Sequence, residues 1–145
     1  MVRSIRYGFV ITFLWLGFVL AISFMEAWVK FRANIELGVA LDVGRHVFAA
    51  LNMVERLFAA LTLVYIFYYH SQRSIVFLGI GLISILVGQS GYLLPRLNEH
   101  AVLIMQGMEP PQDEAHKMYI YMEVGKVLLL SVMGWKQVQL FRRLV

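Results

Sequence analysis

The chain has 145 residues, of which 60% are hydrophobic and 15% are charged, and it contains no cysteine. A soluble domain of this length could not bury so much apolar surface, so the composition is typical of a polytopic membrane protein. The lack of cysteine excludes disulfides and thiolate metal sites. The basic residues lie at the ends of apolar segments, where membrane topology explains them, and we expect no nucleic-acid partner.

Four apolar segments predict four transmembrane helices in one domain spanning residues 1–145, at about 7–30, 42–70, 74–95 and 116–140. Ser71-Gln72-Arg73 is expected to form a tight turn, and Pro95 is expected to end the third helix. Residues 99–105 are predicted to form a short helix on the membrane surface. Two short connections and one longer loop favour an all-α, up-down-up-down antiparallel bundle.

The charges predict the orientation of this bundle. The end that carries both termini and the turn between helices two and three holds six basic residues and no acid: Arg3, Arg6, Arg73, Lys136, Arg142 and Arg143. The positive-inside rule therefore places both termini in the cytoplasm. We expect an integral, multi-pass protein surrounded by the lipid bilayer, with a bacterial inner membrane as the expected location.

Small residues recur at three- and four-residue steps in the predicted third helix: Gly81, Ser84, Gly88 and Gly91. Such a face lets another helix approach closely. It predicts a contact with a second copy or with a larger membrane complex. One hypothesis for function is therefore a structural subunit.

Polar and ionisable residues gather in the half of the bundle opposite the termini, and nine of them form the predicted ligand pocket: Glu26, Arg45, Asn52, Glu55, Gln89, His116, Tyr119, Glu123 and Lys126. Ionisable groups at membrane depth are expensive and mark either a wet cavity or close pairing. The four residues on the last helix are spaced three, four and three apart, so they share one stripe. The first hypothesis is an outward-facing polar pocket that binds or passes a small polar or ionic ligand.

The alternative is a set of ion pairs that fix helix register: Glu26 with Lys30, Glu55 with Arg45 or Arg56, and Glu123 with Lys126. A di-iron site would need a Glu-x-x-His motif, which is missing, so no metal is expected. Haem is an open possibility.

Two histidines, His46 and His116, lie near the outer ends of helices two and four and are candidate haem ligands. No cofactor is assigned beyond this possibility. No catalytic residue is assigned either, because the sequence contains no credible hydrolase triad and no glycine-rich phosphate loop.

The second helix contains Arg45-x-x-x-Ala49-x-x-Asn52-x-x-Glu55. This pattern resembles the second-helix motif of the membrane-associated proteins in eicosanoid and glutathione metabolism. The resemblance implies four helices, a similar chain length and a trimer that binds glutathione between its subunits. By it, Arg45, Asn52 and Glu55 would contact glutathione, and the protein would be a glutathione-dependent membrane transferase.

Overall fold

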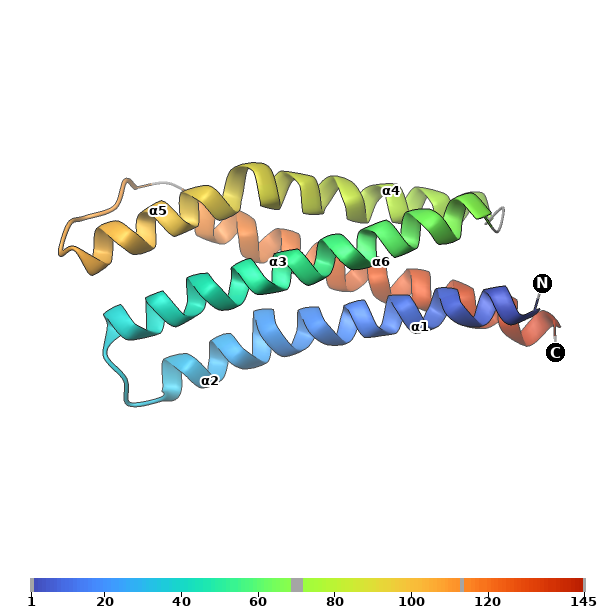
Figure 1. Cartoon of the computed structure of the whole chain (residues 1–145), viewed down its shortest axis with the longest axis horizontal. Coiled ribbons are helices and arrows are strands. Elements are labelled where there is room, and N and C mark those ends of the chain that lie inside the picture. The colour runs from blue at the N-terminus through green and yellow to red at the C-terminus, as the bar shows by residue number, and fades with distance from the viewer. Residues whose placement is uncertain (1, 69–71, 113, 145) are drawn as a thin grey trace.

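The structure is a computed structural model that describes residues 2–68, 72–112 and 114–144. Its helices form four long rods (Figure 1). The first rod consists of α1 (Val2–Val19), the π-helix η1 (Leu20–Glu26) and α2 (Ala27–Arg32), and the second is α3 (Leu37–Tyr68). The third consists of α4 (Arg73–Gly88), the π-helix η2 (Gln89–Leu93) and α5 (Leu94–Met105), and the fourth is α6 (Ala115–Leu144). Each rod contains a segment long and apolar enough to cross a membrane. The prediction of an all-α membrane protein with four antiparallel helices is confirmed.

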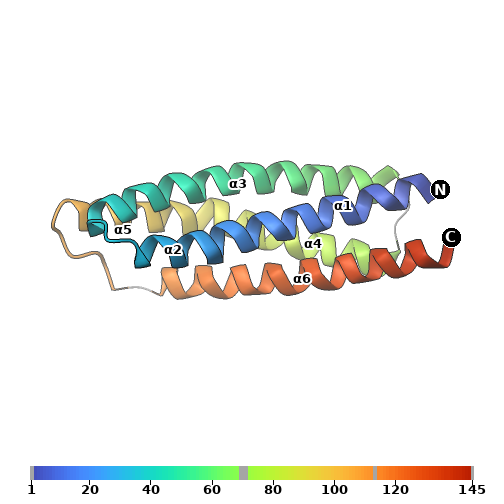
Figure 2. The same ribbon diagram turned by 90° about the horizontal axis from the view of Figure 1, so that it is seen from below.

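The rods form a closed ring in which α1 and α4 each pack against both α3 and α6. Both termini lie at one end, and the two longer connections lie at the other (Figures 1 and 2). We call these the terminal half and the loop half, divided at the level of Trp15 and Phe58. The shared end of the termini agrees with an up-down-up-down bundle, while its cytoplasmic placement stays a prediction.

The prediction that Pro95 ends the third helix is wrong. Pro95 lies at the start of α5, directly after η2, and the helix continues to Met105. Proline lacks an N–H, and its ring clashes with the carbonyl of the preceding turn. A π-helical turn breaks the regular hydrogen-bond ladder at this place, which allows the rod to continue past the proline.

Other observed helix boundaries also differ from the predicted ones, again because the helices are longer. Residues 99–105 are the end of the third rod, packed on α3, and do not form a separate surface helix. The first rod begins at Val2 and the second at Leu37, so the rods are longer than predicted. Of the predicted turn Ser71-Gln72-Arg73, Ser71 lies outside the described residues and Arg73 already belongs to α4.

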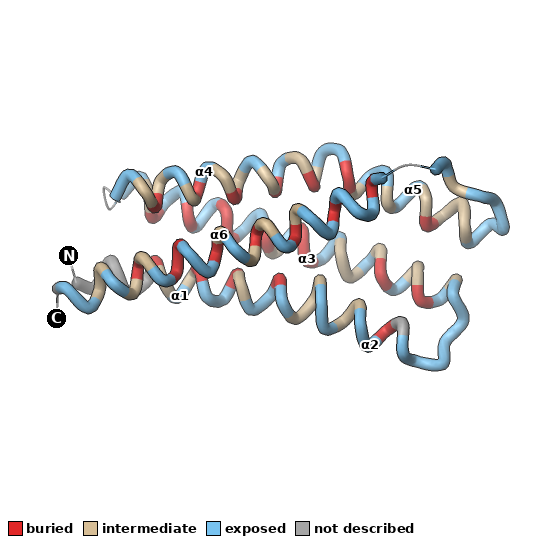
Figure 3. Tube along the Cα trace, turned by 180° about the vertical axis from the view of Figure 1, so that it is seen from behind, coloured by how far each residue is buried: buried red, intermediate tan, exposed pale blue. Residues whose placement is uncertain are grey.

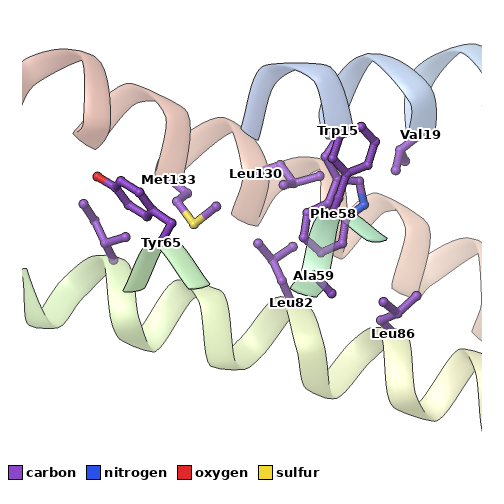
Figure 4. Packing of buried hydrophobic residues seen from close by; sticks show 10 residues of the cluster. Trp15, Val19, Phe58, Ala59, Tyr65, Leu82, Leu86, Leu130 and Met133 are labelled. Atoms are coloured by element: carbon purple, nitrogen blue, oxygen red, sulfur yellow. The ribbon is translucent and has the colours of Figure 1, made fainter. Parts of the chain in front are cut away.

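The buried residues follow the inward faces of the rods (Figure 3). In the terminal half they form an apolar core in which Trp15 stacks on Phe58, with ring centroids 6.2 Å apart, next to Leu82 and Leu130 (Figure 4). Glycines let large side chains approach the opposite helix. A Cβ at Gly8 would lie 2.5 Å from Cζ of Tyr65, and one at Gly134 would lie 2.9 Å from Cζ of Phe13.

The small residues predicted to form one face of the third rod do not all have the same surroundings. Gly81 and Gly88 face α6, because a Cβ would lie 3.5 Å from Leu129 at the first and 3.9 Å from Met122 at the second. Ser84 and Gly91 are exposed. Half of these small residues therefore pack inside this chain, and a contact of the other half with a partner stays a prediction.

Candidate functional site

The interior of the bundle holds a charge network centred on Lys126, which is completely buried. Its Nζ lies 2.6 Å from Oε1 of Glu55 and 2.9 Å from Oε1 of Glu123, so it joins α3 to α6. Buried charges of this kind are tolerated only when paired and hydrogen-bonded. The network contains two carboxylates and one ammonium, and so carries one excess negative charge when all three groups are ionised.

Glu55 receives a second donor from the first rod. The indole Nε1 of Trp15 donates to Oε1 of Glu55 at 3.0 Å, the same oxygen that Lys126 contacts. Trp15 is fully buried in the apolar core, so its indole N–H needs an acceptor there. This bond ties the core of the terminal half to the network.

Glu123 accepts more bonds than Glu55. Gln89 Nε2 donates to its Oε1 at 3.0 Å, and Ser23 Oγ donates to its Oε2 at 3.1 Å. The buried Tyr119 lies one helical turn before Glu123 on α6. Gln89 Oε1, at the other end of that amide, is buried and has no hydrogen-bond partner among the described residues. The network therefore offers more acceptors than donors.

Both π-helices deliver side chains to this region. Ser23 lies in η1, and Gln89 and Ser90 lie in η2. Ser90 Oγ accepts a hydrogen bond from Asn52 Nδ2 at 2.7 Å. A π-helical turn rotates the side chains that follow it relative to a regular helix, and such turns are frequent at functional sites. Here they aim small polar groups at α3 and α6.

A pocket of about 350 Å³ lies in the loop half, between α2, α3, α5 and α6. Most of its lining is apolar, formed by Phe24, Ala27, Ala40, Leu41, Gly44, Phe48, Leu94, Leu97, Ala101 and Ile120. Ser23, Tyr119 and Glu123 also line it; Ser23 and Glu123 belong to the network, and Tyr119 lies one helical turn before Glu123. The pocket therefore ends on the charge network, and we call these three residues its floor.

Two cations line the same pocket, and each is paired. Lys30 Nζ lies 3.3 Å from Oε1 of Glu26, and Arg45 Nε lies 2.7 Å from Oδ1 of Asp42. Lys30 reaches this position because Gly44 has no side chain. A Cβ at Gly44 would lie only 2.6 Å from the Nζ of Lys30. The charges of these two pairs cancel, which leaves the excess negative charge of the network.

The structure distributes the nine predicted pocket residues over three places. Four of them line the pocket: Arg45, His116, Tyr119 and Glu123. Three lie behind it in the network: Glu55, Gln89 and Lys126. The remaining two, Glu26 and Asn52, bond to Lys30 and Ser90. Most polar side chains thus bond to each other, and the pocket walls are mainly apolar.

The predicted register-setting pairs of Glu26 with Lys30 and of Glu123 with Lys126 are present. The predicted pairing of Glu55 with Arg45 or Arg56 is wrong, because Lys126 takes that carboxylate. A helical wheel of α3 cannot reveal this preference, since Lys126 comes from another rod and is close only after the bundle has formed.

Among the described residues, no arrangement of side chains supports the haem or metal hypotheses. The described residues contain no group of three or more histidine, aspartate or glutamate side chains placed to hold a metal ion. His116 lines the pocket, whereas His46 is exposed beside Asp42, with its Nδ1 2.8 Å from the Asp42 carbonyl oxygen.

Sequence reasoning missed Trp15, Ser23 and Ser90. Each is a hydrogen-bonding side chain within an apolar segment, and a polar group at membrane depth needs a partner. That signal was present, but the partners lie on other rods.

No family model matches the chain, and no curated protein or solved structure shows significant similarity to it. Its function is therefore inferred from the chemistry of the site.

Proposed function

We propose that this multi-pass membrane protein binds a small amphipathic molecule in the pocket of the loop half. A cationic or hydrogen-bond-donating head lies on the floor formed by Ser23, Tyr119 and Glu123, and an apolar body lies against the walls. The observation that carries this proposal is an apolar-walled pocket that ends on Glu123. Binding sites commonly combine such walls with a few convergent polar groups.

The hydrogen bonds of the floor favour a donor on the ligand. The hydroxyl proton of Ser23 is directed to Glu123, so the Ser23 oxygen can offer a lone pair but no further proton. Glu123 as a carboxylate can only accept. An ammonium, amide N–H or hydroxyl group fits this floor, and a carboxylate does not.

The charges support the same preference. The two ion pairs beside the pocket are each neutral, and the network behind the floor holds two carboxylates for one ammonium. A bound cation would compensate that excess charge in surroundings of low dielectric constant. The rings of Phe24, Phe48 and Tyr119 line the same space and can add cation–π attraction.

Three probes of one size test the proposal: 2-phenylethylammonium, 2-phenylethanol and 3-phenylpropanoate. Calorimetric titration of the purified protein in lipid nanodiscs should rank the ammonium first and the carboxylate last. Ala27→Phe fills the pocket and should abolish binding, whereas Ala60→Phe, on the exposed face of α3, should leave it unchanged. Equal binding of all three probes, or ammonium binding that survives Ala27→Phe, contradicts the proposal.

Glutathione is a second candidate ligand, since Arg45, one residue of the motif in α3, lines the pocket. The other two motif residues, Asn52 and Glu55, already bond within the bundle and would have to be released. Conjugation of glutathione to an electrophile by the purified protein, lost in Arg45→Leu, would support this candidate. Lack of any glutathione-dependent product would reject it.

A further inference from the structure

Arg56 is an exposed charged residue in the middle of a membrane-spanning helix. It belongs to α3, and its neighbours Met53 and Leu57 on the same surface are 69% and 59% exposed. These apolar neighbours identify the surface as one that faces lipid or another protein. An arginine on it requires an explanation that the pocket and the charge network do not supply.

The position of Arg56 along the helix places it deep in the bilayer. α3 has 32 residues and is roughly 48 Å long at about 1.5 Å per residue. Arg56 then lies roughly 18 Å from Tyr68 and roughly 28 Å from Leu37. When a hydrocarbon layer of about 30 Å is centred on the helix, Arg56 lies within about 5 Å of its midplane.

The side chain does not turn toward the nearer membrane surface. Arg56 Nε donates to the carbonyl oxygen of Asn52 at 3.4 Å, one turn back toward the loop half. This bond is long, and it leaves most of the guanidinium donors for other groups. Arginine at the centre of a spanning helix costs on the order of 100-fold in the membrane-insertion equilibrium. A partner that accepts its hydrogen bonds would offset this cost.

We propose that the Arg56 face of α3 binds a transmembrane helix of another protein that carries an aspartate or glutamate at the same depth. A carboxylate accepts two parallel hydrogen bonds from a guanidinium, which suits a contact without water. The exposed residues Ala49, Met53, Arg56 and Ala60 are spaced four, three and four apart and form one stripe. The two alanines flank the arginine and permit close approach of a second helix.

A second copy of this chain does not fit the stripe. In a symmetric dimer with its axis along the membrane normal, residues of both copies meet at equal depth, so Arg56 would face Arg56. The acids at that depth, Glu55 and Glu123, are held in the interior by Lys126. The exposed glutamates among the described residues lie in or near the connections of the loop half, at positions 36, 99, 109 and 114.

The first test needs no knowledge of the partner. No acidic side chain among the described residues pairs with Arg56, so Arg56→Leu should raise the melting temperature of the isolated protein in nanodiscs. Arg142→Leu removes a charge from the exposed end of α6 and should leave it unchanged. A lower melting temperature for Arg56→Leu would show that the arginine serves its own bundle, and an unchanged one would show that it is already solvated. Both results overturn the proposal.

The second test identifies what covers the stripe. A photo-crosslinking amino acid replaces Met53, or Leu128 on the exposed face of α6 as the control, in cells that naturally produce the protein. The proposal predicts an adduct at Met53 with an apolar segment of another protein that contains Asp or Glu. Arg56→Leu should reduce it by about tenfold or more, and Arg56→Lys should retain part of it. Adducts only with lipid, with a second copy, or with a segment lacking an acid contradict the proposal.

Discussion

Near the termini the four rods meet through glycines and large apolar side chains, whereas near the loops they meet through paired charges around a pocket. In the terminal half, Tyr65 fills the space above Gly8 and Phe13 fills the space above Gly134. In the loop half, an ammonium fills the space above Gly44, and both π-helices turn polar side chains inward. The same helical architecture thus carries a closely packed part, whose core is mainly apolar although Thr62 Oγ1 and Gln137 Oε1 are buried there without a hydrogen-bond partner among the described residues, and a part in which paired charges border a pocket.

The contrast shows where this protein can change without losing its fold. Close apolar packing tolerates little alteration of volume, because added atoms have no room. The charge network depends on charge balance, and the pocket beside it already contains free volume. Substitutions should therefore act through volume in the terminal half and through charge in the loop half.

Removal of the shared cation should have the largest effect. Lys126→Met leaves two buried carboxylates without their ammonium and should lower the free energy of unfolding by about 3–5 kcal/mol. Denaturant unfolding in micelles measures this loss. Addition of Glu123→Gln should recover part of the stability but not ligand binding. A loss below about 0.5 kcal/mol, the size of an ordinary surface substitution, would show that the charges are not coupled.

A methyl group at Gly8 should have the next largest effect. The new Cβ would lie 2.5 Å from the Tyr65 ring, and such overpacking typically costs about 1–3 kcal/mol. Gly17→Ala on the same helix meets no atom within 4 Å and should stabilise the protein by up to about 1 kcal/mol. Thermal unfolding of both variants compares them directly. Equal effects would mean that the terminal half is not closely packed around Tyr65.

Trp15→Phe tests the link between the two halves. It keeps an aromatic ring on Phe58 but removes the donor to Glu55, and the expected loss is about 1–3 kcal/mol. Trp28→Phe, at a residue that is 58% exposed, should stay within about 0.5 kcal/mol. If the two tryptophan variants unfold alike, the hydrogen bond to Glu55 contributes nothing to stability.

The smallest effects are expected on the third rod. Gly88→Leu adds side-chain atoms toward Met122, which is flexible, and should cost about 1 kcal/mol. Gly91→Leu meets no atom within 4 Å and should stay within about 0.5 kcal/mol in the isolated protein. Unfolding of both variants in nanodiscs measures the difference. If Gly88→Leu left the free energy of unfolding unchanged, this would contradict the packing of this face on α6.

Hydrophobic segments were enough to predict the four spans, the helical class and the antiparallel order, because the bilayer demands long apolar helices. The continuation past Pro95 could not be predicted in this way, since it depends on η2, and a π-helix has no simple signature in composition. The predicted stop followed a rule that holds for regular α-helices only.

The site was predicted in part. The stripe of Tyr119, Glu123 and Lys126 follows from helical spacing alone, and the structure joins Glu123 to Lys126 in the network, with Tyr119 beside Glu123 in the pocket lining. The partner of Glu55 did not follow, because it comes from a distant rod. Periodicity shows which residues share one helix face, whereas the contacts between faces depend on how the rods rotate against each other.

Cysteine accessibility tests most directly whether an open pocket ends on the charge network, since the chain has no cysteine of its own. Three single variants on the first rod sample its surroundings: Ser23→Cys on the pocket floor, Val19→Cys in the core and Leu14→Cys on the exposed face. In nanodiscs, a water-soluble cationic methanethiosulfonate should modify Ser23→Cys, and prior addition of 2-phenylethylammonium should slow that reaction. Val19→Cys and Leu14→Cys should not react. An unreactive Ser23→Cys, or equal rates at all three positions, would contradict an accessible pocket that ends on the charge network.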